Sequence, residues 1–174
     1  MCGIFFYTEK NKNIKKEILN KVIQLSEKRG LDNLGICFKN DEIEIIKNNI
    51  LEEKIYKTKH FNKTVLKKND FTFGQCRLVT DGPRFKQEFN QPIVTKKFVG
   101  THNGIILDYT SNTYSENVNS KNDTRNFYED ITNKDFQSIF DFENYLKSKR
   151  GILNIIFFDL EEDKLYFFSN NGSL

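Results

Sequence analysis

A chain of 174 residues is long enough to bury a sizeable core and suits a single domain. The 27 Lys and Arg residues nearly balance the 24 Asp and Glu residues, so the net charge of +3 does not indicate a nucleic-acid-binding surface. No stretch approaches the roughly 18 apolar residues of a membrane span, and no secretory signal is evident. Three cysteines without a Cys-x-x-Cys pair argue against a disulfide framework or a zinc site, and favour a soluble cytoplasmic protein with reduced thiols.

Apolar spacing in the first half predicts strands around one clear helix. The predicted strands are Gly3–Tyr7, Leu34–Phe38, Glu42–Ile46 and Phe71–Val79. A helix that ends near Arg29-Gly30 lies between the first two strands. Its apolar face is predicted to consist of Ile14, Ile18, Val22 and Leu25. The segment Lys63–Lys68 is interpreted as solvated surface.

The second half predicts three strands and two helices. The predicted strands are Phe98–His102, Ile152–Phe158 and Lys164–Ser169, the first stopped by the turn pair Asn103-Gly104. A short helix is expected to start with Asp123 as its cap. A longer helix is expected over Asp135–Lys149, with a face formed by Phe136, Ile139, Phe140 and Leu146. No linker divides the chain, so we expect a single α+β domain of antiparallel sheets flanked by helices.

Cys2 directly follows the initiator methionine. Removal of Met1 would place a thiol and a free α-amine on one residue. The α-amine has an ordinary pKa of roughly 7.7–8.0, so part of it is neutral near pH 7 and can accept the proton of the thiol. The position alone is weak evidence for a nucleophile, because cysteine also occurs there by chance.

Four further segments contain side chains suited to this chemistry. They are Arg29-Gly30-Leu31-Asp32-Asn33-Leu34-Gly35, Gly74-Gln75-Cys76-Arg77-Leu78-Val79-Thr80-Asp81-Gly82, Thr101-His102-Asn103-Gly104-Ile105-Ile106 and Asn122-Asp123-Thr124. Together with Met1-Cys2-Gly3-Ile4, they resemble the glutaminase domain of class II glutamine amidotransferases, which are N-terminal-nucleophile hydrolases. The resemblance covers residues 1–174 as one domain. It implies a four-layer αββα sandwich of two antiparallel sheets flanked by helices.

The resemblance also implies an activity. L-glutamine would be hydrolysed to glutamate and ammonia through a γ-glutamyl thioester, with no cofactor, no metal, no nucleic acid and no membrane. Ile105 stands where asparagine synthetases typically carry Glu, so within the family the chain most resembles the glucosamine-6-phosphate synthase branch. The family normally continues beyond Asn170–Leu174, so the domain is expected to be either minimal or short at its C-terminus. The expected partner is a separate ammonia-accepting synthase or isomerase subunit, with aminosugar synthesis favoured and asparagine-type amidation second.

The reacting groups implied by the resemblance are Cys2 as nucleophile, with the Asn103 side chain and the Gly104 N–H as donors to the oxyanion. Attack on the glutamine amide generates negative charge on its oxygen, and these donors would stabilise that charge. The single histidines, His60 and His102, lack the spacing of metal ligands.

Glutamine also offers an α-carboxylate and an α-ammonium for recognition. The guanidinium of Arg77 matches a carboxylate with two parallel hydrogen bonds, and Asp123 is the expected partner of the ammonium. The resemblance implies that Thr80 shapes the pocket. Arg29 and Asp32 are expected to order their own loop.

Taken singly, these residues have ordinary interpretations. Arg77 alone fits a surface salt bridge, Asn103-Gly104 a hairpin turn, and Asp123 a helix cap. Cys37 and Cys76 are expected to be small core residues. The alternative for the whole chain is a catalytically silent glutamine-binding domain with a regulatory or scaffolding role in an amidotransferase complex.

Overall fold

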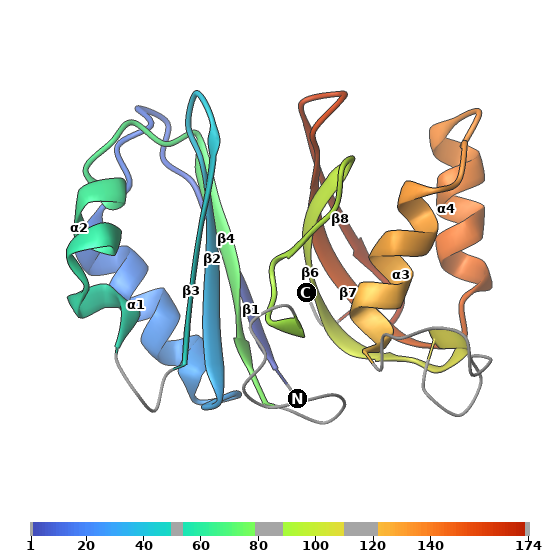
Figure 1. Cartoon of the computed structure of the whole chain (residues 1–174), viewed down its shortest axis with the longest axis horizontal. Coiled ribbons are helices and arrows are strands. Elements are labelled where there is room, and N and C mark those ends of the chain that lie inside the picture. Colours follow the sequence, from blue (N-terminus) through green and yellow to red (C-terminus); the bar gives the residue numbers. More distant parts are fainter. Residues whose placement is uncertain (1, 50–53, 79–88, 110–121, 173–174) are drawn as a thin grey trace. The chain divides into compact units, whose positions relative to one another are not determined.

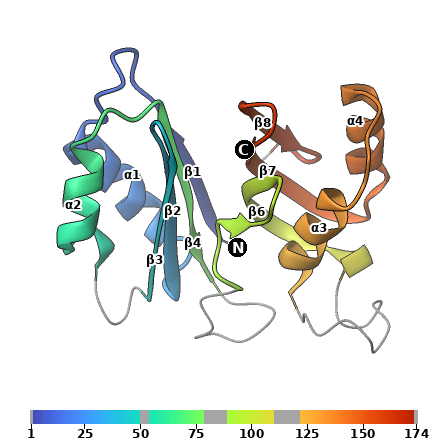
Figure 2. The ribbon, with the colours of Figure 1, turned by 45° about the horizontal axis from the view of Figure 1, so that its top comes forward.

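The computed structural model describes residues 2–49, 54–78, 89–109 and 122–172. The chain divides into two compact units, Met1–Pro92 and Ile93–Leu174. Each unit has one four-stranded antiparallel sheet with helices on one of its faces (Figures 1 and 2). The expected α+β composition of antiparallel sheets and helices is therefore confirmed. That residues 1–174 form one glutaminase domain stays a prediction.

The first unit has strands in the order β1-β4-β2-β3. Their bounds are β1 Gly3–Tyr7, β2 Asn33–Lys39, β3 Ile43–Asn49 and β4 Phe71–Arg77. The helices are α1 Lys16–Glu27, the short 3-10 helix η1 Ile55–Lys57 and α2 Lys59–Val65. Alternate residues of β2 (Leu34, Ile36, Phe38) join the core that includes Leu19 and Ile23 of α1. The intervening residues of the strand therefore lie on the sheet face without helices.

Helix α1 forms where expected, but only part of the predicted face is buried. Ile14, just before the helix, lies in the core and Val22 packs against it, as predicted. Leu19 and Ile23 are fully buried, whereas Ile18 and Leu25 are 42% and 53% exposed. Both sets have helical spacing, so periodicity alone did not distinguish them. The contact with β1 selects the buried face, because a Cβ on Gly3 would lie 2.5 Å from the Ser26 carbonyl oxygen.

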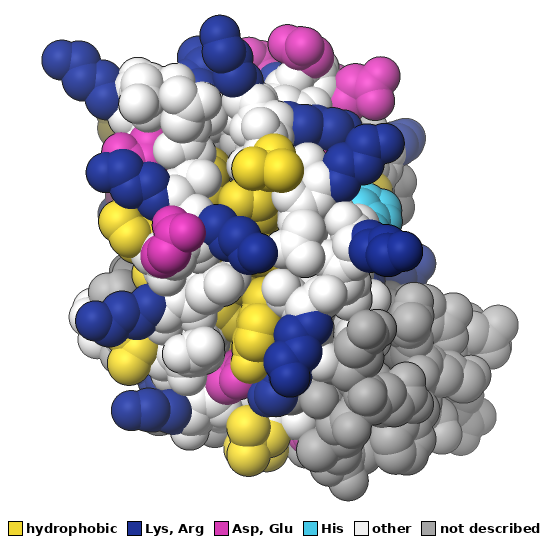
Figure 3. Space-filling view, turned by 90° about the vertical axis from the view of Figure 1, so that its left-hand side faces the viewer, with side chains coloured by type: hydrophobic (Ala, Val, Ile, Leu, Met, Phe, Trp, Pro, Cys, Tyr) yellow, Lys and Arg dark blue, Asp and Glu magenta, His cyan; other side chains and the backbone are white. Residues whose placement is uncertain are grey.

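Helix α2 was not predicted, because its segment is rich in lysine. Phe61 and Val65 are nevertheless buried, while Lys63 is exposed as expected. On the side of the molecule shown in Figure 3, Lys and Arg side chains are interspersed with Asp, Glu and apolar side chains. This mixture agrees with the interpretation of the lysines as solvated surface.

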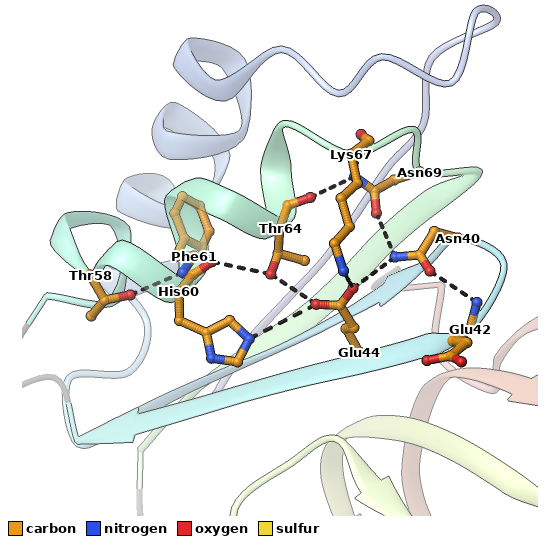
Figure 4. Close-up of polar contacts among 9 residues, drawn as sticks. All are labelled: Asn40, Glu42, Glu44, Thr58, His60, Phe61, Thr64, Lys67 and Asn69. Atoms are coloured by element: carbon orange, nitrogen blue, oxygen red, sulfur yellow. Dashed lines mark hydrogen bonds and ion pairs between the residues drawn. The ribbon is translucent and has the colours of Figure 1, made fainter.

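A polar cluster around Glu44 fastens β3 to the end of α2 (Figure 4). The Glu44 carboxylate accepts hydrogen bonds from Thr64 Oγ1 at 3.0 Å, Asn40 Nδ2 at 3.1 Å and the Lys67 ammonium. The hydrogen bond from Lys67 is the largest cause that lowers the pKa of Glu44. Exposed His60 lies 3.9 Å from the same carboxylate.

The second unit has strands in the order β5-β6-β7-β8. Their bounds are β5 Ile93–Val94, β6 Phe98–Ile106, β7 Gly151–Asp159 and β8 Lys164–Ser169. The helices are η3 Leu107–Tyr109, α3 Asp123–Thr132 and α4 Ile139–Ser148. The strands predicted over Ile152–Phe158 and Lys164–Ser169 are confirmed as β7 and β8, and they form a hairpin with Asp159 opposite Lys164.

Three details of the second unit correct the predictions. Strand β6 does not stop at Asn103-Gly104 but continues to Ile106, paired with β7 throughout. The cap of α3 is Asn122, whose side chain accepts the Arg125 N–H, and Asp123 is the first helical residue. Helix α4 begins only after its own cap, Ser138.

The late start of α4 also changes its buried face. Phe142 and Leu146 pack in the core, whereas Ile139 and Phe140 are 54% and 71% exposed. Phe136 lies before the helix and packs against the same core. None of the helices in the described ranges has the length and apolar run needed to cross a membrane.

Asp130 connects α3 to η3 and α4 through hydrogen bonds. These bonds predict a pH-dependent contribution to the free energy of unfolding. Its carboxylate accepts hydrogen bonds from the hydroxyls of Tyr109, at 2.5 Å, and Tyr145. Burial raises the pKa of Asp130, but these hydrogen bonds outweigh that effect and hold the pKa below its ordinary value. We expect Asp130→Asn to lower the free energy of unfolding by about 1–2 kcal/mol at pH 7.

A carboxylate with a lowered folded-state pKa stabilises the protein above its unfolded pKa of about 3.9, and this stabilisation disappears as the pH falls through the folded pKa. The difference between Asp130→Asn and the wild type should therefore vanish at acid pH. Urea unfolding at pH 7 and at successively lower pH measures it. A difference that stays constant with pH would contradict the assignment.

Candidate functional site

In the first unit, Cys2 and Arg77 lie at neighbouring strand ends. Strands β1 and β4 are antiparallel with Gly3 opposite Cys76, so the register continued by one residue sets Cys2 opposite Arg77. The Leu78 N–H donates to Cys2 Sγ at 3.4 Å, and the thiol reaches the Leu78 carbonyl at 3.5 Å. Cys2 itself is partly exposed.

Arg77 is buried, with only 4% of its surface exposed. Its Nη1 donates to Asn90 Oδ1 at 3.0 Å. Its carbonyl accepts the Asp32 N–H at 2.9 Å. Arg77 therefore does not lie at the surface, as its interpretation as a surface salt-bridge residue required. A guanidinium held this deeply is suited to a charged ligand, because burial strengthens the pairing of opposite charges.

The alternation of strand residues separates Arg77 from its neighbour Cys76. Cys76 faces α1, where its thiol lies 3.8 Å from the Ile23 carbonyl oxygen. Arg77 consequently lies on the helix-free face of the sheet, as does buried Gln75. The prediction that Cys37 and Cys76 are core residues is confirmed, and burial raises the pKa of both thiols well above the ordinary value.

The loop after α1 packs against the strand end that bears Arg77. A Cβ on Gly30 would lie 2.3 Å from the Cys76 carbonyl oxygen and 2.5 Å from the Arg77 carbonyl carbon. Only glycine allows the loop to approach this closely. Asp32 is buried beside the strand, while Arg29 is exposed. Their predicted role in ordering the loop stays a prediction.

In the second unit, Asn103 lies within β6 and is 2% exposed. Its carbonyl accepts a hydrogen bond from Asn154 Nδ2, at 3.0 Å, on β7. Its own side-chain oxygen has no hydrogen-bond partner among the residues that the structure describes. A buried polar atom left unpaired is costly, so this carboxamide is a candidate for binding a ligand.

Gly104 follows with a φ of +152°, in the region that favours glycine. A Cβ there would lie 1.8 Å from the Ile152 carbonyl oxygen and 2.9 Å from His102 Nε2. The pair Asn103-Gly104 is therefore not a hairpin turn, and its glycine is required by close packing inside a paired strand.

Asp123 joins the first turn of α3 to the end of β6. Its Oδ2 accepts the Ile106 N–H at 2.9 Å, and its Oδ1 accepts the Thr124 N–H at 2.7 Å. The residue is 8% exposed, and its position in the first helical turn suits a negative charge. A carboxylate has about four acceptor sites, so each oxygen can accept a further donor.

The structure thus places Cys2 near Arg77 in one unit, and it places Asn103, Gly104 and Asp123 around the end of β6 in the other. Thr80 and the adjacent Asp81-Gly82 lie outside the described residues. No group of three or more side chains that could hold a metal occurs in the part of the chain that the structure describes.

Sequence reasoning missed the roles of two residues that contact these side chains or their neighbours. Asn90 accepts a hydrogen bond from Arg77, and His102 contacts Thr124 beside Asp123. Asn90 belongs to no periodic segment, so no sequence signal indicated it. His102 was considered only for metal binding, which its spacing disfavoured, although its place directly before Asn103 was a usable signal.

No family model matches the chain, and no curated protein matches it. Solved structures share its fold. One is a glutamine phosphoribosylpyrophosphate (PRPP) amidotransferase from B. subtilis complexed with ADP and GMP. It is 17% identical with a TM-score of 0.61, and the match covers 91% of this chain and 34% of that one.

A second structure is described as the allosteric regulatory enzyme of purine biosynthesis. It is 14% identical with a TM-score of 0.71, and the match covers 100% of this chain and 38% of that one. The chain therefore spans just over a third of the length of these chains. The chain shares its fold with the matched parts of these two structures, and the fold class expected from the sequence, antiparallel sheets flanked by helices, is confirmed.

Proposed function

We propose that the protein hydrolyses L-glutamine to glutamate and ammonia, with Cys2 as the nucleophile once Met1 has been removed. The observation that carries this proposal is the pairing of Cys2 with buried Arg77 at adjacent ends of β1 and β4. A thiol beside a buried guanidinium suits a substrate that has a reactive carbonyl and a carboxylate. The shared fold supports the same assignment.

The reaction proceeds in two steps. The α-amine of Cys2 takes the thiol proton as Sγ attacks the side-chain amide carbon of glutamine. The C–N bond breaks, the α-amine returns the proton to the departing nitrogen, and ammonia leaves a γ-glutamyl thioester. Water then attacks the thioester, which releases glutamate and restores the thiol.

Two residues recognise the charged end of the substrate. Arg77 binds the α-carboxylate with its guanidinium, which Asn90 holds in position. Asp123 binds the α-ammonium, because both its oxygens are already oriented by backbone N–H groups. Thr80 completes the pocket in this proposal.

Asn103 and Gly104 stabilise the oxyanion formed in each step. The donor of Asn103 in this role is its Nδ2 group, because a carboxamide oxygen only accepts hydrogen bonds. The unpaired Asn103 oxygen is then left to accept an N–H of the glutamine side-chain amide, which supports placing this carboxamide against the substrate. A donor fixed in advance at the developing charge needs no reorganisation during the reaction.

The ammonia is proposed to pass to a separate synthase or isomerase subunit in the cytoplasm. An aminosugar synthase is the first candidate, because Ile105 follows Asn103-Gly104, and an asparagine-type acceptor is the second. The alternative is a silent glutamine-binding domain, which would keep the pocket and hydrolyse nothing.

A diazoketone analogue of glutamine tests the proposal. It should form one covalent adduct, located on Cys2 by intact mass and peptide mapping, and the raised thiol pKa should leave Cys37 and Cys76 unmodified. Binding of glutamine without any adduct, in a protein whose Met1 is shown to be absent, would favour the silent domain.

Arg77→Lys should raise the KM for glutamine on the order of 10²-fold, with a smaller effect on kcat. Lysine keeps the charge but loses the paired hydrogen bonds to the carboxylate, and such buried charged contacts are each worth several kcal/mol, about 2–5. Steady-state release of glutamate measures both constants. A lysine variant with unchanged KM would show that Arg77 only supports the fold.

A further inference from the structure

His102 and Thr124 form a buried pair next to Asp123. The proposed mechanism does not use this pair. Their side chains are 2% and 3% exposed, on β6 and at the start of α3. His102 Nδ1 lies 3.0 Å from Thr124 Oγ1, and His102 Nε2 lies 3.0 Å from the Ile152 carbonyl oxygen on β7. The ring thus connects the strand that carries Asn103 to the helix that begins with Asp123.

The contacts assign the proton positions of this pair. A carbonyl oxygen only accepts, so Nε2 carries a hydrogen that it donates to Ile152. In the neutral ring Nδ1 is then an acceptor, and the Thr124 hydroxyl donates to it. Burial lowers the pKa of His102, with Asp123 on α3 as the charged group that opposes this effect.

The direction of the Thr124 hydroxyl matters to Asp123. Thr124 Oγ1 lies 3.3 Å from Asp123 Oδ1, but the hydroxyl has a single proton. While His102 is neutral, that proton points to Nδ1. If His102 is protonated, Nδ1 becomes a donor to Oγ1, and the hydroxyl proton turns to Asp123 Oδ1.

We propose that His102 is a positioning residue that keeps the Thr124 hydroxyl directed away from Asp123, so that the remaining acceptor site of Oδ1, beside the bond from the Thr124 N–H, stays available to the α-ammonium of glutamine. This inference rests on the proposed function. His102 acts through Thr124 and does not touch the substrate. Its neutral form favours glutamine binding, and its protonated form weakens binding.

A double-mutant cycle tests the proposal. In His102→Gln, the new side chain keeps an N–H donor for the Ile152 carbonyl but has no imidazole nitrogen to accept the Thr124 hydroxyl. The hydroxyl should then turn to Asp123 and raise the KM for the substrate glutamine about 10-fold, with little change in kcat. Adding Thr124→Val removes the competing hydroxyl and should lower the KM again. A purely structural role of His102 predicts that the double variant is at least as impaired as His102→Gln.

The pH dependence gives a second readout, which stays available even if His102→Gln fails to fold. The KM of the wild type should rise as the pH falls through the pKa of His102, which lies below the ordinary value of about 6.5. Thr124→Ser keeps the hydroxyl and should keep this rise, whereas Thr124→Val should lose it. The matched control is Thr132→Val at the other end of α3, which should behave as the wild type.

The outcomes separate this inference from the proposed function. A wild type that neither hydrolyses glutamine nor forms the Cys2 adduct overturns both. An active wild type overturns the inference alone if Thr124→Val keeps the rise in KM at acid pH, or if the double variant shows no recovery of KM.

Discussion

Replacing Cys2 with serine is expected to lower the rate of glutamine hydrolysis by about 10³-fold or more. Removal of a nucleophile that acts together with its base usually costs at least this much. The hydroxyl of serine is a far weaker acid than a thiol, so an α-amine placed to accept the proton of a thiol would activate it much less. Stability should change little, because Cys2 is partly exposed and its sulfur contacts the backbone of Leu78.

A second variant separates the thiol from the α-amine. An alanine inserted between Met1 and Cys2 keeps the thiol but moves the free amine to another residue, so hydrolysis should fall by a similar factor. Ammonia release measures the activity, and intact mass reports whether Met1 has been removed. Iodoacetamide should still alkylate Cys2 in this variant, which shows that the thiol is accessible. Full activity after the insertion would refute the role of the α-amine.

Asn103→Ala is expected to lower kcat by about 10²–10³-fold without lowering the free energy of unfolding. Loss of one oxyanion donor has an effect of that size. The side-chain oxygen of Asn103 is buried without a partner in the described ranges, so its removal costs the folded state no hydrogen bond at that atom. Activity and stability should therefore respond in different ways.

The matched control is Asn154→Ala, directly opposite on β7 and on the same face of the sheet. The Asn154 side chain donates to the Asn103 carbonyl and accepts from Ser169 Oγ at 2.6 Å. We expect this variant to lose about 1–2 kcal/mol of stability with a smaller effect on kcat. Urea unfolding and steady-state kinetics of both variants measure the contrast. If Asn103→Ala loses stability and keeps kcat, the carboxamide is structural.

Several elements were predictable because they depend on local pattern. The continuous apolar run of β1 and the hairpin of β7 and β8 appear at or near the predicted bounds. Strand β2 likewise needs only alternation and a turn after Lys39. In these segments, the apolar pattern that forms the strand and the residues that end it are neighbours in the sequence, so the strand bounds can be predicted locally.

The helix faces were not predictable in the same way. Ile18 and Leu25 have helical spacing, as do Leu19 and Ile23. The strand against which α1 packs decides which of the two pairs is buried. Helix α4 starts later than expected because Ser138 caps it, which leaves Ile139 and Phe140 exposed. Periodicity defines that a helix has an apolar side, but the packing partner defines which side is buried.

The sequence by itself determined the residue types of the site and their order along the chain: a thiol at position 2, a guanidinium at a strand end, an Asn-Gly pair and an acid at a helix start. Only the tertiary structure decided their surroundings. Arg77 is buried and bonded to Asn90, and Asn103 has an unpaired oxygen inside a continuous strand. Likewise, Asp123 is oriented beside a His102–Thr124 pair. The physical reason is that burial and hydrogen bonding depend on segments far apart in the sequence, which local pattern does not specify.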